Sequence, residues 1–301
     1  MSDPEIIALR EVIAKRVRSD DIAQRRRDID ARGLAYRLPA DVAVEPITAN
    51  GVGSEWTTTP DADRGKAVLY LHGGGYVIGS LDSHRHLVAE IGRAARARAL
   101  AIDYRLAPEH PFPAAVDDAL AAYRFLVMSG VQPGGITVAG DSAGGGLVIA
   151  VMLAIRDAGL PQPACGWAIS PWVDMEALGD SMTSKAAADP TVQKAGILDL
   201  AKHYLNGANP RSALAAPIYA DLRGLAPLLI QVGAAETLLD DAVRLAQVAG
   251  AADVAVDLQV WPEMIHVWHI YYPELAAGRR AIAAGGEFAR AMTSRGSRSS
   301  F

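Results

Sequence analysis

Short apolar runs alternate with longer amphipathic segments along most of this chain. Each run ends in a glycine-rich or polar turn, and the segment after it carries apolar residues at the spacing of one helix face. This alternation is typical of βαβ units on a mostly parallel sheet. The runs predict strands at Ala67–Leu71, Leu100–Asp103, Ile136–Ala139, Gly166–Ile169, Leu228–Val232 and Val254–Val260. The other segments predict helices at Arg85–Arg98, Ala114–Met128, Ala143–Asp157, Asp241–Ala249 and Pro273–Ala291.

The beginning of the chain has a different pattern. Residues 3–32 show apolar residues at helical spacing followed by dense mixed charge, which predicts one or two helices. The run Arg25–Arg27 lies among aspartates, so a solvated helix face explains it better than a nucleic-acid site. Val42–Thr59 then alternates around Asn50-Gly51, which predicts a hairpin.

A second irregular region lies between Pro171 and Pro227. It shows no clear strand pattern, only short helical pieces near Ile197–Leu205 and scattered prolines. A long insertion at the end of a strand often forms part of a lid over a site.

The composition narrows the class of protein. Half of the 301 residues are apolar, which is enough for a large core. The 29 basic and 34 acidic side chains leave a net charge of −5, which argues against a nucleic-acid binder. No apolar stretch reaches the about 20 residues of a membrane helix, and the N-terminus lacks the apolar segment of a signal peptide. The lone Cys165 fits a reducing compartment, so we expect a soluble, cytoplasmic protein.

The segment Gly140-Asp141-Ser142-Ala143-Gly144 carries the clearest chemical signal. It follows a predicted strand and precedes a predicted helix. The spacing G-x-S-x-G places a serine on a tight turn, where small flanking residues let the hydroxyl project above the sheet. The N-terminus of the next helix directs positive partial charge toward it. Because such a match also arises by chance in glycine-rich chains, Ser142 needs support from elsewhere in the sequence.

His72-Gly73-Gly74-Gly75 supplies that support. It follows the predicted strand Ala67–Leu71 and lies 70 residues before Ser142. Consecutive glycines let backbone N–H groups approach a substrate, as the oxyanion hole of acyl transfer requires. A phosphate-binding loop would need a helix and a Lys-Ser/Thr pair soon after, and Tyr76-Val77-Ile78 supplies neither.

Together with Asp103–Ala115, whose sequence is DYRLAPEHPFPAA, these two motifs resemble the bacterial hormone-sensitive-lipase-like esterases. The resemblance covers about residue 66 to the end of the core. It implies an α/β-hydrolase fold and a serine carboxylesterase that acts on short-chain acyl esters without metal or organic cofactor. It also places the oxyanion-binding N–H groups on Gly74, Gly75 and Ala143.

The resemblance further implies a lid made of N-terminal helices and an insertion after a late strand. We therefore expect cap helices at residues 1–40, a catalytic domain at residues 41–301, and a second cap segment inserted at about residues 175–220. The prolines of the Asp103–Ala115 loop predict a rigid scaffold for the glycine loop, in which Arg105 and Glu109 could form an ion pair.

The catalytic histidine of this fold follows the serine and the acid in the chain. That order excludes the histidines before Ser142, and His203 lies in the expected cap. His266 and His269 remain, both directly after a predicted strand, at the sheet edge where ligands bind. His266 matches the family's position between a short apolar pair and an apolar-aromatic pair, and His269 stays the alternative.

The acid departs from the family pattern, which is Asp-Pro-Leu followed one residue later by Asp. The segment here, residues 233–240, is GAAETLLD. Aligning Leu238 and Asp240 places Glu236 at the position of the catalytic aspartate, with the same charge and one more methylene. A glutamate can also hold an imidazole in the required tautomer. Asp240 and Asp241 remain alternatives, and their other role would be to cap the following helix.

The sequence thus predicts a serine carboxylesterase in which Ser142 is the nucleophile, His266 the base and Glu236 the acid. An amidase or peptidase on the same fold is a rival that the triad alone does not separate. A ligand-binding receptor is a second rival, although such relatives lose the histidine that this chain retains. A small-molecule ester is the expected partner and a homodimer is compatible with the sequence, whereas no nucleic acid, membrane span or metal is expected.

Overall fold

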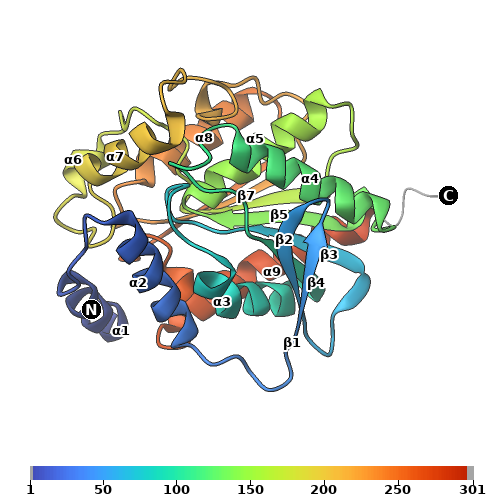
Figure 1. Cartoon of the computed structure of the whole chain (residues 1–301), viewed down its shortest axis with the longest axis horizontal. Helices are drawn as coiled ribbons and strands as arrows, with labels where there is room; N and C mark the ends of the chain where they lie inside the picture. Colours follow the sequence, from blue (N-terminus) through green and yellow to red (C-terminus); the bar gives the residue numbers. More distant parts are fainter. Residues whose placement is uncertain (1–2, 297–301) are drawn as a thin grey trace.

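A sheet of eight strands runs through the part of the chain that this computed structural model describes, residues 3–296 (Figure 1). The strand order is β1-β2-β4-β3-β5-β6-β7-β8. The pairs β1/β2 and β2/β4 are antiparallel and the other pairs are parallel. The outermost residues of the two predicted domains, 1–2 and 297–301, lie outside the described range. The strands are β1 (Ala43–Ala49), β2 (Val52–Thr58), β3 (Asp63–Leu71), β4 (Ala97–Ile102), β5 (Ile136–Asp141), β6 (Cys165–Ile169), β7 (Leu228–Gly233) and β8 (Val256–Trp261).

Helices cover both faces of the sheet (Figure 1). On one face α3 and α9 pack around a core that includes Leu87 and Ile282. On the other face α4, α5 and α8 pack around a larger core that includes Val148 and Leu245. The mostly parallel sheet between two helical layers is the predicted fold class. These helices are α3 (Leu81–Ala95), α4 (Ala114–Met128), α5 (Ala143–Asp157), α8 (Leu239–Ala251) and α9 (Ala276–Gly296).

A further group of helices gathers on one side of the molecule, at the left of Figure 1. It combines the chain's first two helices with two from the segment between β6 and β7, where no strand occurs among the described residues. The apolar side chains of Ile6 and Ile13 pack against Met264, Ile265 and Trp268, which follow β8. The four helices are α1 (Pro4–Ala14), α2 (Ile22–Leu34), α6 (Ser181–Ser184) and α7 (Lys194–Leu205).

Arg26 fastens α2 to the catalytic core. Its guanidinium donates to two backbone carbonyl groups and to both carboxylate oxygens of Glu109, at 2.9 and 2.7 Å. Arg105 pairs instead with Asp118, at 2.8 Å. The predicted ion pair between Arg105 and Glu109 is therefore wrong. Glu109 pairs with Arg26, which lies 83 positions away in the chain, and no local sequence pattern shows such a contact.

The predicted elements occur at the expected places, and the differences lie at their ends. α4 and α5 have the predicted bounds. α3 begins at Leu81 rather than Arg85, because the side chains of Ser80 and Ser83 cap each other's backbone N–H groups. After Leu81 that first turn holds Asp82, Ser83 and His84, so the regular apolar pattern begins after the helix does.

Candidate active site

Ser142 occupies the turn between β5 and α5. Its backbone has φ 55° and ψ −119°, in a region that residues with a side chain rarely adopt. A Cβ atom at Gly140 or at Gly144 would overlap the backbone carbonyl oxygen of Leu71. The two glycines of G-x-S-x-G therefore let β5, α5 and the end of β3 approach closely enough for this turn to form.

Three side chains from three loops form a continuous hydrogen-bonded chain. The Ser142 Oγ lies 2.9 Å from His266 Nε2, and His266 Nδ1 lies 3.1 Å from Glu236 Oε1. Ser142 follows β5, Glu236 follows β7 and His266 follows β8, so parallel strands bring the three together at one edge of the sheet. The structure thus brings together the serine, the histidine and the glutamate that the sequence analysis singled out.

The second carboxylate oxygen of Glu236 is also held. Glu236 Oε2 accepts hydrogen bonds from the Ser170 hydroxyl and from the Gly233 backbone N–H, both at 2.8 Å. The Ser170 Oγ in turn accepts a hydrogen bond from the backbone N–H of Val267, next to His266. Ser170 therefore connects the acid to the histidine loop and fixes the orientation of both. Sequence reasoning missed this residue, although a small polar residue directly after the buried strand β6 is a signal that could have found it.

The two alternative acids have other partners. Asp240 Oδ2 accepts a hydrogen bond from the backbone N–H of Ser181 at 2.8 Å. Asp241 Oδ2 accepts from the N–H groups of Val173 and Asp174, and burial raises the pKa of this carboxyl to about 7. Both carboxylates thus hold the segment after β6 and do not reach His266. Neither caps α8 in the predicted way, since the N-cap is Leu238 and no side chain bonds there.

His269, the alternative histidine, is buried away from Ser142. Its Nε2 lies 2.9 Å from Gln231 Oε1, and burial lowers its pKa to about 3. An imidazole that stays neutral beside an amide serves as a structural hydrogen-bond partner within the core.

The charge state of His266 depends on its partner. Burial by itself lowers the pKa of His266, but the hydrogen bond to Glu236 and the charge of that carboxylate outweigh it, so the pKa is raised above the usual 6.5. An imidazole of this kind is a stronger base than an isolated one, and its cation keeps a fixed anionic neighbour.

The glycine loop after β3 faces the serine. Gly74 and Gly75 have φ of +118° and +65°, and a Cβ at Gly74 would overlap the Ile78 carbonyl group. Among residues 3–296, no acceptor takes the backbone N–H of Gly74, Gly75 or Ala143. Three donors without an internal partner therefore lie around one serine.

Buried polar side chains hold that loop in place. The N–H of Gly73 donates to Asp141 Oδ1 at 3.0 Å, and the Tyr70 hydroxyl donates to the same oxygen at 2.7 Å. The Tyr104 hydroxyl donates to the carbonyl oxygen of His72. His72 contacts the Gly73 carbonyl oxygen through Nδ1 and stacks on the Tyr104 ring, so its side chain helps to hold the loop.

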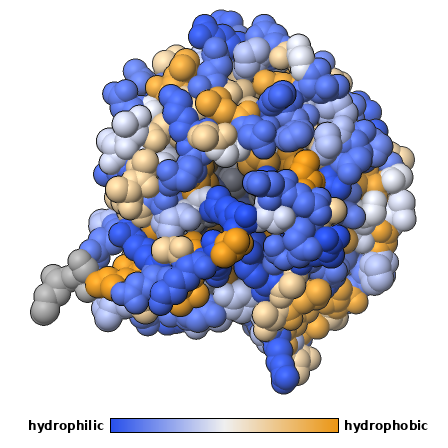
Figure 2. Space-filling view, turned by 60° about the vertical axis from the view of Figure 1, so that its left-hand side comes forward, coloured by the Kyte–Doolittle hydropathy of each residue, from blue (hydrophilic) through white to orange (hydrophobic). Residues whose placement is uncertain are grey.

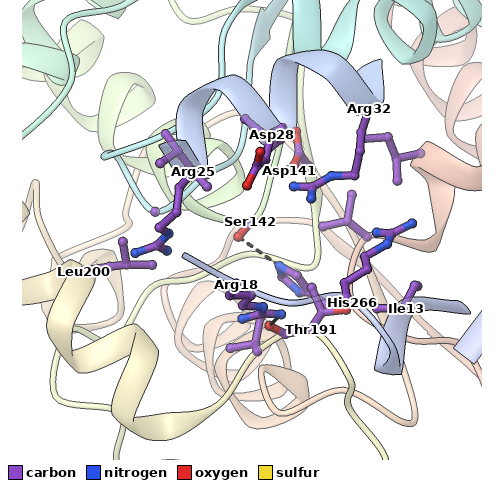
Figure 3. Close-up of a pocket in the computed structure, with 18 of the residues that line it drawn as sticks. Ile13, Arg18, Arg25, Asp28, Arg32, Asp141, Ser142, Thr191, Leu200 and His266 are labelled. Carbon is purple, nitrogen blue, oxygen red and sulfur yellow. Dashed lines mark hydrogen bonds between the residues drawn. The ribbon is translucent and has the colours of Figure 1, made fainter. Parts of the chain in front are cut away.

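A cavity of about 240 Å³ opens above the serine. Ser142 and His266 lie at its base, with Gly74 and Gly75 beside them, and residues of α1, α2 and α7 form the opposite side (Figure 3). Within the described residues there is no group of three histidine, cysteine, aspartate or glutamate side chains that could hold a metal ion. The same part of the chain has no helix long and apolar enough to cross a membrane.

This geometry defines an α/β-hydrolase. A family model described as the alpha/beta hydrolase fold matches residues 68–270. The chain is 46% identical to an acetyl-hydrolase of Streptomyces hygroscopicus, over 98% of this chain and 99% of the relative. It is 31% identical to an esterase of Acinetobacter venetianus, over 83% of each.

Solved structures give the narrower family. A crystal structure of an esterase from the bacterial hormone-sensitive lipase family superposes with a TM-score of 0.95 at 47% identity, covering 97% of this chain and 99% of the other. A crystal structure of EstE5 soaked with p-nitrophenyl butyrate superposes with a TM-score of 0.94 at 46% identity, covering 97% of this chain and all of the other. The chain belongs to the bacterial hormone-sensitive-lipase family, and it is a carboxylic ester hydrolase.

Proposed function

We propose that this chain is a serine carboxylesterase that hydrolyses short-chain esters through an acyl-enzyme. The observation that carries the proposal is the hydrogen-bonded chain from Ser142 through His266 to Glu236 at the base of an open cavity. A nucleophile, a base and an orienting acid in this order are the arrangement that activates a serine hydroxyl.

In the first half of the reaction, Ser142 Oγ bonds to the ester carbonyl carbon while its proton passes to His266 Nε2. Glu236 holds the imidazole and stabilises its cation. The backbone N–H groups of Gly74, Gly75 and Ala143 donate hydrogen bonds to the oxyanion. This assignment is supported by the lack of any acceptor for these three donors within the described chain. The bond to the alcohol oxygen then breaks, and that oxygen takes the proton from His266.

In the second half, water repeats the sequence on the acyl-enzyme. His266 Nε2 accepts a proton from the water as its oxygen bonds to the acyl carbon. The bond to Ser142 Oγ breaks, and the returning proton restores the serine hydroxyl and releases the carboxylic acid.

Short acyl groups fit the cavity best. A second, smaller hollow of about 70 Å³ adjoins the main cavity beside Ser142, and Trp172, Ile197 and Leu200 are among the residues that line it. A hollow of this size has room for a short acyl chain. The names of the relatives agree, since one is an acetyl-hydrolase and EstE5 was soaked with a butyrate ester.

The helices over the cavity form the cap in this proposal, residues 1–40 together with about 175–220. Its support is that Ile13 and Ile29 from the first segment and Val192 and Leu200 from the second line the same cavity. We also propose the cytoplasm as the location, because the one cysteine is buried and free, as a reducing compartment allows.

A panel of 4-nitrophenyl esters of increasing acyl length tests the proposal, with wild type and Ser142→Ala measured side by side. We expect kcat/KM to be highest for short chains and turnover to be absent in the variant. Matched ester and amide substrates separate the esterase from an amidase, and faster cleavage of the amide would overturn the assignment. Turnover that survives Ser142→Ala would overturn the mechanism.

A further inference from the structure

Arginines gather on the cap side of the cavity. Arg16, Arg18, Arg25 and Arg32 line it, and Asp28 is the one acidic residue that the cap contributes to the lining. Figure 3 shows Arg25 and Arg32 extending from α2 on either side of Ser142, with Arg18 opposite them. Figure 2 shows the same face of the molecule, where strongly hydrophilic side chains gather around a hollow.

The spacing along α2 explains why these side chains share a face. Arg25, Asp28 and Arg32 follow one another at intervals of three and four residues, and Ile29 lies four after Arg25, so they form one stripe along two turns of the helix. The stripe faces the cavity, as the lining residues show. Arg26 lies off this stripe and holds Glu109, and Arg27 bonds to Gln24 of its own helix.

The lining arginines fall into two kinds. Arg16 donates to the Tyr271 hydroxyl at 2.9 Å and ties the cap to the core, and Arg18 donates to the Thr191 carbonyl oxygen and joins the two cap segments. The side chains of Arg25 and Arg32 form no hydrogen bond or ion pair with any of residues 3–296. Two guanidinium groups beside the nucleophile are therefore available to a ligand.

The charges around these two groups do not neutralise them. Asp28 accepts a hydrogen bond from the Gln24 amide; its charge acts on Arg32, but it forms no ion pair with either arginine, and Asp141 is buried among its own donors. Partial burial and the charge of Arg16 lower the pKa of Arg32, but a guanidinium stays cationic at any working pH. The chain as a whole carries −5, so this positive lining is a local feature of the cavity.

We infer that the esters cleaved at this site carry an oxyanionic group, a carboxylate or a phosphoryl group, away from the reacting carbonyl, and that Arg25 and Arg32 bind it. A guanidinium presents a planar set of donors that matches both kinds of group. The inference rests on the proposed esterase function for the reaction, while the anion preference is a separate property of the cap. Positive lining without a fixed partner also attracts such substrates before they dock.

Two substrate pairs test the inference, each with an anionic and a neutral member. In the first, 4-acetoxybenzoate and its methyl ester place the charge on the alcohol side. In the second, the mono-4-nitrophenyl ester of adipic acid and 4-nitrophenyl hexanoate place it on the acyl side. The measured quantity is the ratio of kcat/KM within a pair, because differences in intrinsic reactivity cancel when that ratio is compared between proteins.

Arg25→Gln and Arg32→Gln remove one charge each and keep a polar side chain. We expect each to lower the anionic-to-neutral ratio of at least one pair about 10-fold, mainly through the KM of the anionic member. Arg27→Gln is the matched control on the same helix, outside the cavity, and should leave both ratios unchanged. Added salt should lower the wild-type ratio and have less effect on the double variant. Ratios in the double variant within about twofold of wild type, for both pairs, would overturn the inference.

Calorimetric binding separates this inference from the proposed function. Ser142→Ala should bind the anionic member of a pair more tightly than the neutral one, and adding Arg25→Gln and Arg32→Gln should abolish that preference. Loss of the preference supports the anion site whether or not the wild type turns over the esters. Equal binding of both members by Ser142→Ala contradicts the anion site and leaves the esterase function standing.

Discussion

The polar side chains of the core loops and those on the cavity side of the cap helix α2 differ in whether they have hydrogen-bond partners. In the core, Glu236 uses both carboxylate oxygens and His266 both ring nitrogens in hydrogen bonds. On α2, Arg25 and Arg32 reach the same cavity and have no partner within the described chain. A hydrogen-bond network in which every group has a partner fixes the positions of its side chains, whereas unpaired charged groups are available to bind a ligand.

This difference separates two tasks. The core holds the reacting groups at one geometry, which acyl transfer requires of a nucleophile and its base. In our proposal the cap selects which ester reaches them. Changes in the core should therefore act on kcat, and changes in the cap should act on substrate preference.

The largest effect should come from the nucleophile and the base. Ser142→Ala and His266→Ala should each lower kcat about 10⁴-fold or more, because each removes a group that forms or transfers a bond. Ester turnover and thermal unfolding of the same preparations check this. A His266→Ala enzyme that keeps near-full activity, with His269→Ala inactive, would show the histidine assignment to be wrong.

The next effect belongs to the acid. Glu236→Gln should lower kcat about 10²- to 10⁴-fold, because the imidazolium loses its anionic partner. The carboxylate also raises the pKa of His266, so its removal should lower that pKa. Since His266 must be neutral to accept the serine proton, the acidic limb of the pH profile of kcat/KM should move to lower pH in Glu236→Gln.

Glu236→Asp sharpens the same assignment with the charge retained. The shorter side chain stops about 1.5 Å short of the position that Glu236 Oε1 now holds against His266. A misplacement of that size costs about 10²-fold in rate, so Glu236→Asp should be impaired but more active than Glu236→Gln. If both variants matched wild type while Asp240→Asn was inactive, the acid would be Asp240.

A truncation of the N-terminal helices tests the role of the cap. Removing the first 35 residues takes away α1, α2 and the ties made by Arg26, while every strand remains. We expect altered acyl-chain selectivity together with exposed apolar surface around Ile265, which α1 covers, and hence aggregation. A soluble truncated enzyme with unchanged acyl-chain selectivity would contradict the proposed role of the N-terminal cap helices in substrate selection.

The smallest effect should come from a buried carboxylate outside the triad. Burial raises the pKa of Asp241 from 3.8 to about 7, so the unfolded chain releases this proton first as the pH rises. The free energy of unfolding should therefore fall between about pH 4 and pH 7 and then level off. Asp241→Asn does not titrate and should flatten this part of the curve, as urea unfolding across that range would show. An unchanged slope would mean that other groups cause it.

The features that could be predicted from the sequence are those that residues close together in the chain determine. Apolar periodicity indicated the sheet and its helices, and glycine spacing indicated Ser142 and the loop at Gly74, because steric limits act over a few residues. The order of elements along a parallel sheet then limited the candidates for the base to two histidines.

The remaining parts depend on contacts between distant segments. Ser170 holds Glu236 across 66 positions, and Arg26 reaches Glu109 across 83, so no local pattern shows which partner either side chain takes. The same holds for the arginine run on α2, which the sequence analysis treated as a solvated face. Only the packed cap shows that Arg25 faces the nucleophile while Arg26 anchors the helix.

The most direct test of the central claim is labelling with a fluorophosphonate, followed by intact-mass measurement and peptide mapping. The account predicts one phosphonyl group per chain, on the peptide that contains Ser142, with ester turnover lost at the rate of labelling. Ser142→Ala should stay unlabelled, and His266→Ala should be labelled far more slowly than wild type. Labelling of another residue, or full labelling with turnover intact, would contradict the account.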